Sequence, residues 1–112
     1  MRDQLKDTDR LAHITEAIDN VKAFMQDKSF EDLQKDKLLY YGVVKNIEIV
    51  GEAAYKLSVE FKKNHPEIPW KLIEKMRHIM VHGYYKISIP ILYNVYTEDI
   101  PMLESFIKNL NK

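Results

Sequence analysis

The segment from residue 77 to residue 85 combines an arginine, two histidines and two tyrosines. The guanidinium of Arg77 can hold a phosphate through two parallel hydrogen bonds. The imidazole of His82 titrates near neutral pH, so it can take a proton from a hydroxyl group or return one to a leaving oxygen. The pair is therefore suited to a polyanionic ligand and to proton transfer. Taken alone, His82 also fits a helix C-terminal histidine that interacts with free carbonyls and the helix dipole.

Basic groups line the same stretch of chain. Lys71, Lys75, His78 and His82 follow one another at intervals of four, three and four residues, which places them on one face of a helix. Glu74 is the only acid in that span. The 17 Lys and Arg balance 17 Asp and Glu, so a polyanion site must be local. Spacing alone does not separate a phosphate-binding stripe from a solvated helix face.

The apolar residues of this segment are spread too widely for one neighbouring layer to cover. They fall on two sides, with Trp70, Ile73 and Met80 on one and Leu72, Met76 and Ile79 on the other. The helix is therefore either a central one surrounded by its own chain or one that lies at a homodimer interface. Because one imidazole cannot easily be acid and base at once, a two-fold dimer that paired these helices would supply the second histidine.

The periodicity of the chain predicts the helices that position this segment. Apolar residues spaced three and four apart indicate a first helix over about Thr8 to Asp27, with Thr8 or Asp9 as its N-cap. A second, long helix begins at Ser29, and its apolar ladder meets no proline before Pro66. The first half of the chain is therefore expected to be helical.

Punctuating residues divide the rest of the chain. Gly42 and Gly51 weaken the long helix and could mark a bend or a close helix crossing. Residues 65–70 form a stiff connector, because each of their two prolines disfavours helix in the residue before it. A third helix then covers roughly Pro69 to Val81 or His82, with Gly83 as its terminator.

The last segment has its own start and break signals. Ser88 and Pro90 indicate the start of a fourth helix, in which Pro101 places a break or kink. No convincing pair of strands is present. The 112 residues therefore form one all-α domain, residues 1–112, of four or five helices.

Composition excludes several functional classes. Without cysteine there is no disulfide, Cys-type zinc site, iron–sulfur cluster or thiol nucleophile. The three glycines are too scattered for a P-loop or a dinucleotide fingerprint. The first residues lack the apolar core of a signal peptide, and no apolar run approaches membrane-spanning length. We therefore expect a cytoplasmic protein with no membrane partner.

The pattern Arg77-x4-His82-x-Tyr84 resembles the Arg-x4-His-x-Tyr signature of the HEPN superfamily, in particular its small HepT-like ribonuclease toxins. Three further blocks resemble the same family, at residues 9–14 (DRLAHI), 49–54 (IVGEAA) and 65–70 (HPEIPW). The likeness therefore covers almost the whole chain. Arg-x4-His alone occurs by chance in many proteins, whereas four blocks in this order are far more specific.

The resemblance implies a HEPN-type bundle that forms a homodimer, with the two motif-bearing helix ends facing each other across a cleft. It also implies metal-independent endoribonuclease activity without a cofactor, in which the 2′-hydroxyl of RNA attacks the adjacent phosphate. Arg77 would hold the scissile phosphate, and His82 from one or both protomers would transfer protons. His78, together with Lys71 and Lys75, would contact the RNA phosphates.

The resemblance also implies a partner and a switch. Tyr84 matches the tyrosine that a minimal nucleotidyltransferase antitoxin modifies with AMP in toxin–antitoxin systems of type VII. AMP there would place negative charge beside Arg77 and His82 and obstruct the cleft. Residues 86–88 lack the acid that many relatives carry after the motif. Tyr85 is interpreted as an aromatic packing residue.

Other interpretations remain. The chain could be a non-catalytic module that binds RNA, a nucleotide or a partner, or an AMP-accepting component with a regulatory role. Glu52 could orient Arg77 or His82, or be a simple surface acid. Glu48 and Glu52 could also join the histidines at 78 and 82 in a metal site, but no Glu-x-x-His spacing supports it, so we expect no metal.

Overall fold

The computed structural model describes residues 6–82 and 87–110, apart from the side chain of His82. Every element in these ranges is helical, which confirms the all-α prediction. The elements are α1 (Asp7–Met25), α2 (Phe30–Lys35), α3 (Lys37–Tyr55), α4 (Val59–Asn64), α5 (Trp70–His82), α6 (Ile89–Asn94), the π-helical η1 (Val95–Asp99) and α7 (Ile100–Leu110). No helix in the described part of the chain combines the length and the apolarity that crossing a bilayer requires.

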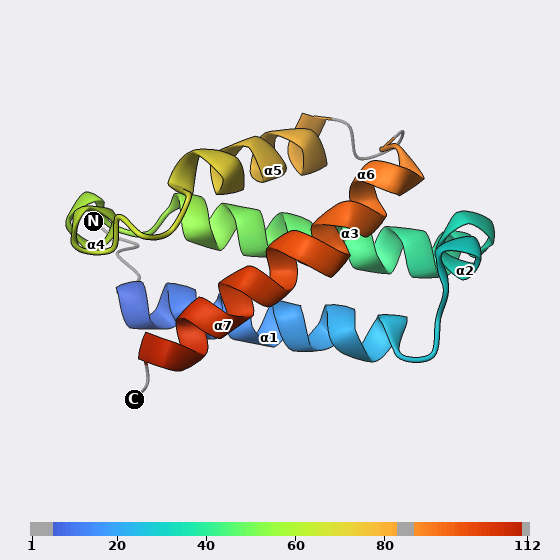
Figure 1. The fold of residues 1–112 in the computed structure, drawn as a ribbon, viewed down its shortest axis with the longest axis horizontal. Helices are drawn as coiled ribbons and strands as arrows, with labels where there is room; N and C mark the ends of the chain where they lie inside the picture. The colour runs from blue at the N-terminus through green and yellow to red at the C-terminus, as the bar shows by residue number, and fades with distance from the viewer. Residues whose placement is uncertain (1–5, 83–86, 111–112) are drawn as a thin grey trace.

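The body of the bundle consists of α1, α3, α5 and the continuous α6–η1–α7 segment. Figure 1 shows α1 and α3 lying side by side in opposite directions, with α5 on the other side of α3. The α6–η1–α7 segment crosses the other helices diagonally, while the short α2 and α4 lie at opposite ends. These four long pieces agree with the predicted four or five helices.

The central helix is α3. It packs against both α1 and α5, and its buried residues include Val43, Val44, Ile47, Val50 and Ala54. The sequence pattern left open whether the helix at residues 70–82 is central or lies at an interface. In the structure α5 covers one face of α3 from outside, so α5 is not surrounded by its own chain.

The single long helix predicted from Ser29 toward Pro66 is wrong, because the structure divides this stretch into α2, α3 and α4. Two side chains cap the new starts. Asp36 accepts a hydrogen bond from the N–H of Leu39 at 3.2 Å, and Ser58 accepts one from the N–H of Phe61 at 3.0 Å. Such caps satisfy backbone donors that a helix start leaves unpaired, so the chain can turn without a proline.

The boundaries of α1 differ slightly from the prediction. Its N-cap is Lys6, not Thr8 or Asp9, and Asp9 instead accepts the backbone N–H of Lys6 at 3.2 Å from the first turn. The helix ends at Met25. Asp27, at the predicted end, has a φ of 62°, a left-handed conformation that continues no α-helix and that aspartate tolerates better than most residues.

The predicted interruption near Pro101 takes the form of the π-helical turn η1, which ends two residues before the proline. The N–H of Ile100 donates to the carbonyl of Val95, five residues earlier. Proline has no N–H and its ring crowds the preceding turn, so a wider turn at this point accommodates it within one helical rod. Ser88 is the N-cap of α6, as predicted.

Candidate functional site

The connector before α5 fixes where that helix begins. The indole N–H of Trp70 donates to the carbonyl of His65 at 3.0 Å, and Ile68 between them is buried. From there α5 runs over Trp70–His82, as the sequence predicted. Its buried residues, Ile73, Met76 and Met80, secure the helix against the bundle. The orientation of Arg77 is therefore set by packing on both sides of it in the sequence.

Gly51 allows α5 to approach α3 at the position of Arg77. A Cβ atom built on Gly51 would lie 2.9 Å from the Cβ and 3.0 Å from the Cα of Arg77. Such distances are too short for any side chain, so only glycine permits this crossing. The close helix crossing that the sequence allowed at Gly51 is thus confirmed, and it brings the backbone of Arg77 directly onto α3.

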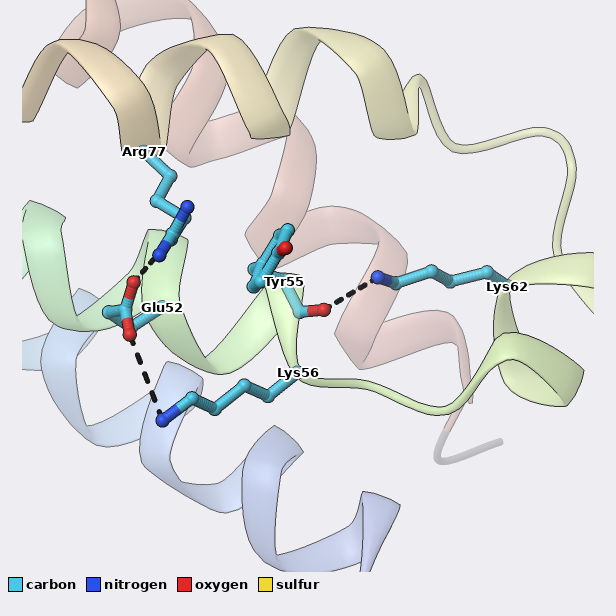
Figure 2. Close-up of polar contacts among 5 residues, drawn as sticks. All are labelled: Glu52, Tyr55, Lys56, Lys62 and Arg77. Carbon is cyan, nitrogen blue, oxygen red and sulfur yellow. Dashed lines mark hydrogen bonds and ion pairs between the residues drawn. The ribbon is translucent and has the colours of Figure 1, made fainter.

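Arg77 is held by two residues of α3. Its Nε donates to a carboxylate oxygen of Glu52, and its Cζ lies 4.1 Å from the centre of the Tyr55 ring. Figure 2 shows Glu52 between the Arg77 guanidinium and the ammonium of Lys56, which lies 3.8 Å from the second carboxylate oxygen. The side chains of Arg77 and Glu52 are 28% and 34% exposed, so the pair lies at the rim of the bundle.

Tyr55 is contacted by Lys62 of α4 as well as by Arg77. Lys62 of α4 donates to the backbone carbonyl of Tyr55 at 2.7 Å, and its ammonium lies 5.4 Å from the ring centre (Figure 2). The Tyr55 ring is thus flanked by two cations, both of which a π face attracts. This arrangement anchors the last turn of α3 under Arg77.

The two contacts leave a defined part of the guanidinium for a ligand. The bond to Glu52 uses Nε, and the Tyr55 ring contacts the guanidinium at its central carbon. These contacts with described residues leave the two terminal amino groups of Arg77 as donors for an anion. A carboxylate and a ring that fix a guanidinium in advance reduce the entropy that anion binding costs. The arrangement can therefore hold a phosphate.

The predicted basic stripe lies on a different side of α5. Lys71, Lys75 and His78 are exposed, as expected for a helix surface. At about 3.6 residues per turn these positions are rotated by roughly 100° to 160° from Arg77 around the helix axis. The helix therefore does not present them beside Arg77 within one protomer. His82 is the last residue of α5, and Tyr84 and Gly83 lie outside the described residues.

The face of α5 next to the stripe borders an apolar hollow. It has a volume of about 320 Å³ and lies between α5 and the α6–η1 segment. Leu72 on one wall is 41% exposed and Ile91 on the other is 45% exposed. Asp99 also lines the hollow, and burial, together with the charge of neighbouring Glu98, raises the pKa of its carboxyl group. The surplus apolar surface that the sequence indicated on α5 is present here.

Ile87, the first described residue after α5, is bonded to α3. It is buried and donates its N–H to the phenolic oxygen of Tyr40 at 3.0 Å. Tyr40 therefore fixes Ile87 against α3. Sequence reasoning missed Tyr40 and Tyr55. Tyr55 could have been found, because it lies three residues after Glu52 and so shares its helix face.

No group of three or more His, Asp or Glu side chains that could hold a metal ion occurs among residues 6–82 and 87–110, the side chain of His82 aside. Glu52, which the sequence offered as a metal ligand, as an orienting residue or as a surface acid, is bound to Arg77. The orienting role is therefore the one that the geometry favours.

Comparison with known proteins identifies relatives of this arrangement. The family model for HepT-like ribonucleases matches residues 14–110. A probable ribonuclease HepT of Thermococcus cleftensis is 36% identical over 93% of this chain and 94% of its own length. A putative RNase of Caldanaerobacter subterraneus subsp. tengcongensis is 34% identical, over 89% of each chain. A gamma-glutamylcyclotransferase and putative RNase of Methanocaldococcus jannaschii is 35% identical over 84% of this chain, which spans 42% of that protein. No solved structure gives a significant match.

Proposed function

The chain belongs to the HepT-like ribonuclease family, and on that premise we propose that it is an endoribonuclease that cleaves RNA without a metal ion. The observation that carries this proposal is the prearranged Arg77. Glu52 and Tyr55 hold its guanidinium at the surface, on the helix whose last residue is His82. An arginine fixed in this way suits the charge that develops on a phosphate during transfer.

The proposed reaction is attack by the 2′-hydroxyl on the adjacent phosphate. One His82 imidazole takes the proton of the 2′-hydroxyl while the O2′–P bond forms and the P–O5′ bond breaks. A second imidazole gives its proton to the departing O5′. The products are a 2′,3′-cyclic phosphate and a free 5′-hydroxyl. Arg77 binds the non-bridging oxygens and stabilises their charge in the transition state.

Two His82 imidazoles in one site require a second copy of the chain, so the proposal includes a homodimer. Positions 77 and 82 are five residues apart and thus differ by about 140° around a helix axis, which favours a site completed across a two-fold axis. The exposed Leu72 and Ile91 beside α5 are suited to burial in such an interface. Lys71, Lys75 and His78, on the outer side of α5, would then contact the RNA phosphates.

The proposed regulation is that of a toxin in a toxin–antitoxin pair. A partner minimal nucleotidyltransferase would transfer AMP from ATP to the Tyr84 hydroxyl and release pyrophosphate. The added phosphate would compete with RNA for Arg77 and block the site. After incubation with a cognate nucleotidyltransferase and ATP, mass spectrometry should show AMP on Tyr84, and Tyr84→Phe should remain unmodified.

The ribonuclease proposal is tested by cleavage of single-stranded RNA in excess EDTA. Wild-type protein should give products with 2′,3′-cyclic phosphate ends, and Arg77→Ala and His82→Ala should each abolish them while circular dichroism shows an intact fold. Lys35→Gln, an exposed change on α2, outside the helix that carries the motif, is the control. Cleavage that chelator stops would contradict the mechanism. RNA affinity without any cyclic-phosphate product would favour the non-catalytic binding module.

A further inference from the structure

A second hollow, lined mainly by charged side chains, lies on the α1–α3 side of the molecule, away from the stripe on α5. It has a volume of about 160 Å³. Its polar lining consists of Arg10 and His13 from α1 and of Lys45, Glu48, Glu52 and Lys56 from α3. The sequence offered no reason to group them, because α1 and α3 bring together positions far apart in the chain.

The charges of this hollow favour an anion. Three permanent cations line it against two carboxylates, and one carboxylate, Glu52, is already bound to Arg77. Lys45 lies 3.9 Å from Glu48 and its side chain is 67% exposed, so that ion pair is weak. The lining therefore carries one more positive than negative charge, in a protein whose formal net charge is zero.

Arg10 supplies an independent observation. Its Nε is buried and has no hydrogen-bond partner among the described residues. A buried donor without a partner costs free energy, and native proteins keep few of them unless a ligand or water completes the bonding. Arg10 is also one of the residues that line the hollow, so an anion held there would bind beside this unpaired donor.

Glu52 connects this hollow to Arg77. One of its carboxylate oxygens accepts from Arg77, and the other faces Lys56 at 3.8 Å (Figure 2). Glu52 therefore belongs both to the lining of the hollow and to the contacts that hold Arg77. A strand bound at Arg77 therefore has a second group of cations, Arg10, Lys45 and Lys56, on the neighbouring surface.

We propose that the Arg10–Lys45–Lys56 hollow between α1 and α3 binds a backbone phosphate of the RNA next to the one held by Arg77. This rests on the proposed ribonuclease function and adds a second subsite to it. The subsite reads charge and not base identity, because its donors are lysine and arginine side chains that would contact phosphate oxygens and not base edges. It makes the protein favour a strand over an isolated dinucleotide.

The test compares a free diribonucleotide with the same cleaved step embedded in a longer single-stranded RNA. In wild type, kcat/KM should be higher for the longer RNA. Arg10→Gln and Lys45→Gln should each reduce that gain by roughly tenfold, as expected for one lost charge-assisted hydrogen bond. Lys35→Gln, which removes a lysine at the far end of the bundle, is the matched control and should keep the gain.

A binding measurement separates this proposal from the ribonuclease proposal. The affinity for a 2′-O-methyl RNA, which cannot be cleaved by this route, is measured against salt concentration. Each variant should lower the magnitude of the logarithmic salt slope by about 0.7, the value for one lost phosphate contact on a single strand. If the wild-type protein binds the 2′-O-methyl RNA with the expected salt slope but does not cleave unmodified RNA, the ribonuclease proposal fails and the subsite stands.

The proposal is overturned if both variants keep the wild-type length gain and salt slope, or if Lys35→Gln loses as much as they do. If Arg10→Gln does not fold, the result for Lys45→Gln decides whether the subsite exists. The side chain of Lys45 is mostly exposed and is not part of the core, so its replacement should leave the fold intact.

Discussion

Replacing Gly51 by alanine tests whether the crossing of α3 and α5 positions Arg77. The new methyl group would meet the Cβ of Arg77 at 2.9 Å and its Cα at 3.0 Å. Neither atom is the end of a flexible side chain, so the contact is relieved only if α5 moves away from α3. That movement would pull Arg77 away from Glu52 and Tyr55.

The expected magnitude comes from two opposing effects. Alanine stabilises a helix interior by up to about 1 kcal/mol relative to glycine. Overpacking at a close contact costs roughly 1–3 kcal/mol. The second effect is larger here because the clash involves backbone, so we expect Gly51→Ala to destabilise the protein by up to about 2 kcal/mol. For a domain of this size the melting temperature would fall by roughly 4 °C per kcal/mol.

Gly42→Ala is the matched control, on the same helix and with the same gain in helix propensity. Its new methyl group would lie 3.2 Å from the edge of the Phe24 ring, a side chain that is 41% exposed and free to shift. We therefore expect Gly42→Ala to be neutral or stabilising. The difference between the two variants isolates the cost of the α3–α5 contact at Arg77.

The assay is urea unfolding followed by circular dichroism, with RNA cleavage as a second measurement. Gly51→Ala should unfold at lower urea than Gly42→Ala, with an unchanged m-value. A misplacement of about 1 Å at a reacting group can cost two orders of magnitude in rate, so cleavage should fall at least about tenfold. If Gly51→Ala is as stable as Gly42→Ala and cleaves RNA as wild type does, the reasoning from this crossing is refuted.

Three further predictions concern single side chains. Glu52→Gln should lower kcat/KM for RNA by more than its effect on stability explains. Urea unfolding should show a stability loss of less than about 1 kcal/mol, because the ion pair with Arg77 is partly exposed. Equal losses of activity and of stability would contradict a positioning role for Glu52. Burial raises the pKa of Asp99, so the folded state favours the protonated form of its carboxyl group. The contribution of this group to stability is therefore present at low pH. It is lost as the pH rises through the range just above the usual aspartate pKa. Asp99→Asn should therefore raise the urea midpoint at neutral pH and flatten its decline between acid and neutral pH. Tyr40→Phe removes the acceptor of the Ile87 N–H and should cost about 1 kcal/mol in urea unfolding, whereas an unchanged midpoint would mean that this bond anchors nothing.

The start of the helix that carries the motif was predictable from local signals. Two prolines at residues 65–70, followed by an amphipathic run, define where α5 begins, and α5 spans Trp70–His82 in the structure. The middle of the chain was not predicted, although Asp36 and Ser58 are good N-caps. An apolar ladder without proline reads as one helix even though it contains Gly42 and Gly51, and whether a cap interrupts it depends on the partners that the turn finds. Ser58 finds one in Asp7, to which its N–H and hydroxyl donate at 2.9 and 2.7 Å.

The candidate site divides in the same way. The types and spacing of Arg77 and His82 are properties of one short segment, and the likeness to the family is carried by four such segments spread along the chain. The partners of Arg77 are not, because Glu52 and Tyr55 reach it only through a helix crossing that depends on the missing side chain of Gly51.

Sequence by itself determined the all-α class, the motif helix and the candidate residues Arg77 and His82, since each depends on residues close together in the chain. The tertiary structure decided which helix is central, what holds the guanidinium of Arg77, and that Arg10 meets Lys45 and Lys56 across a charged hollow. Those relations join residues from different helices, and only the packing of one helix on another sets their distances.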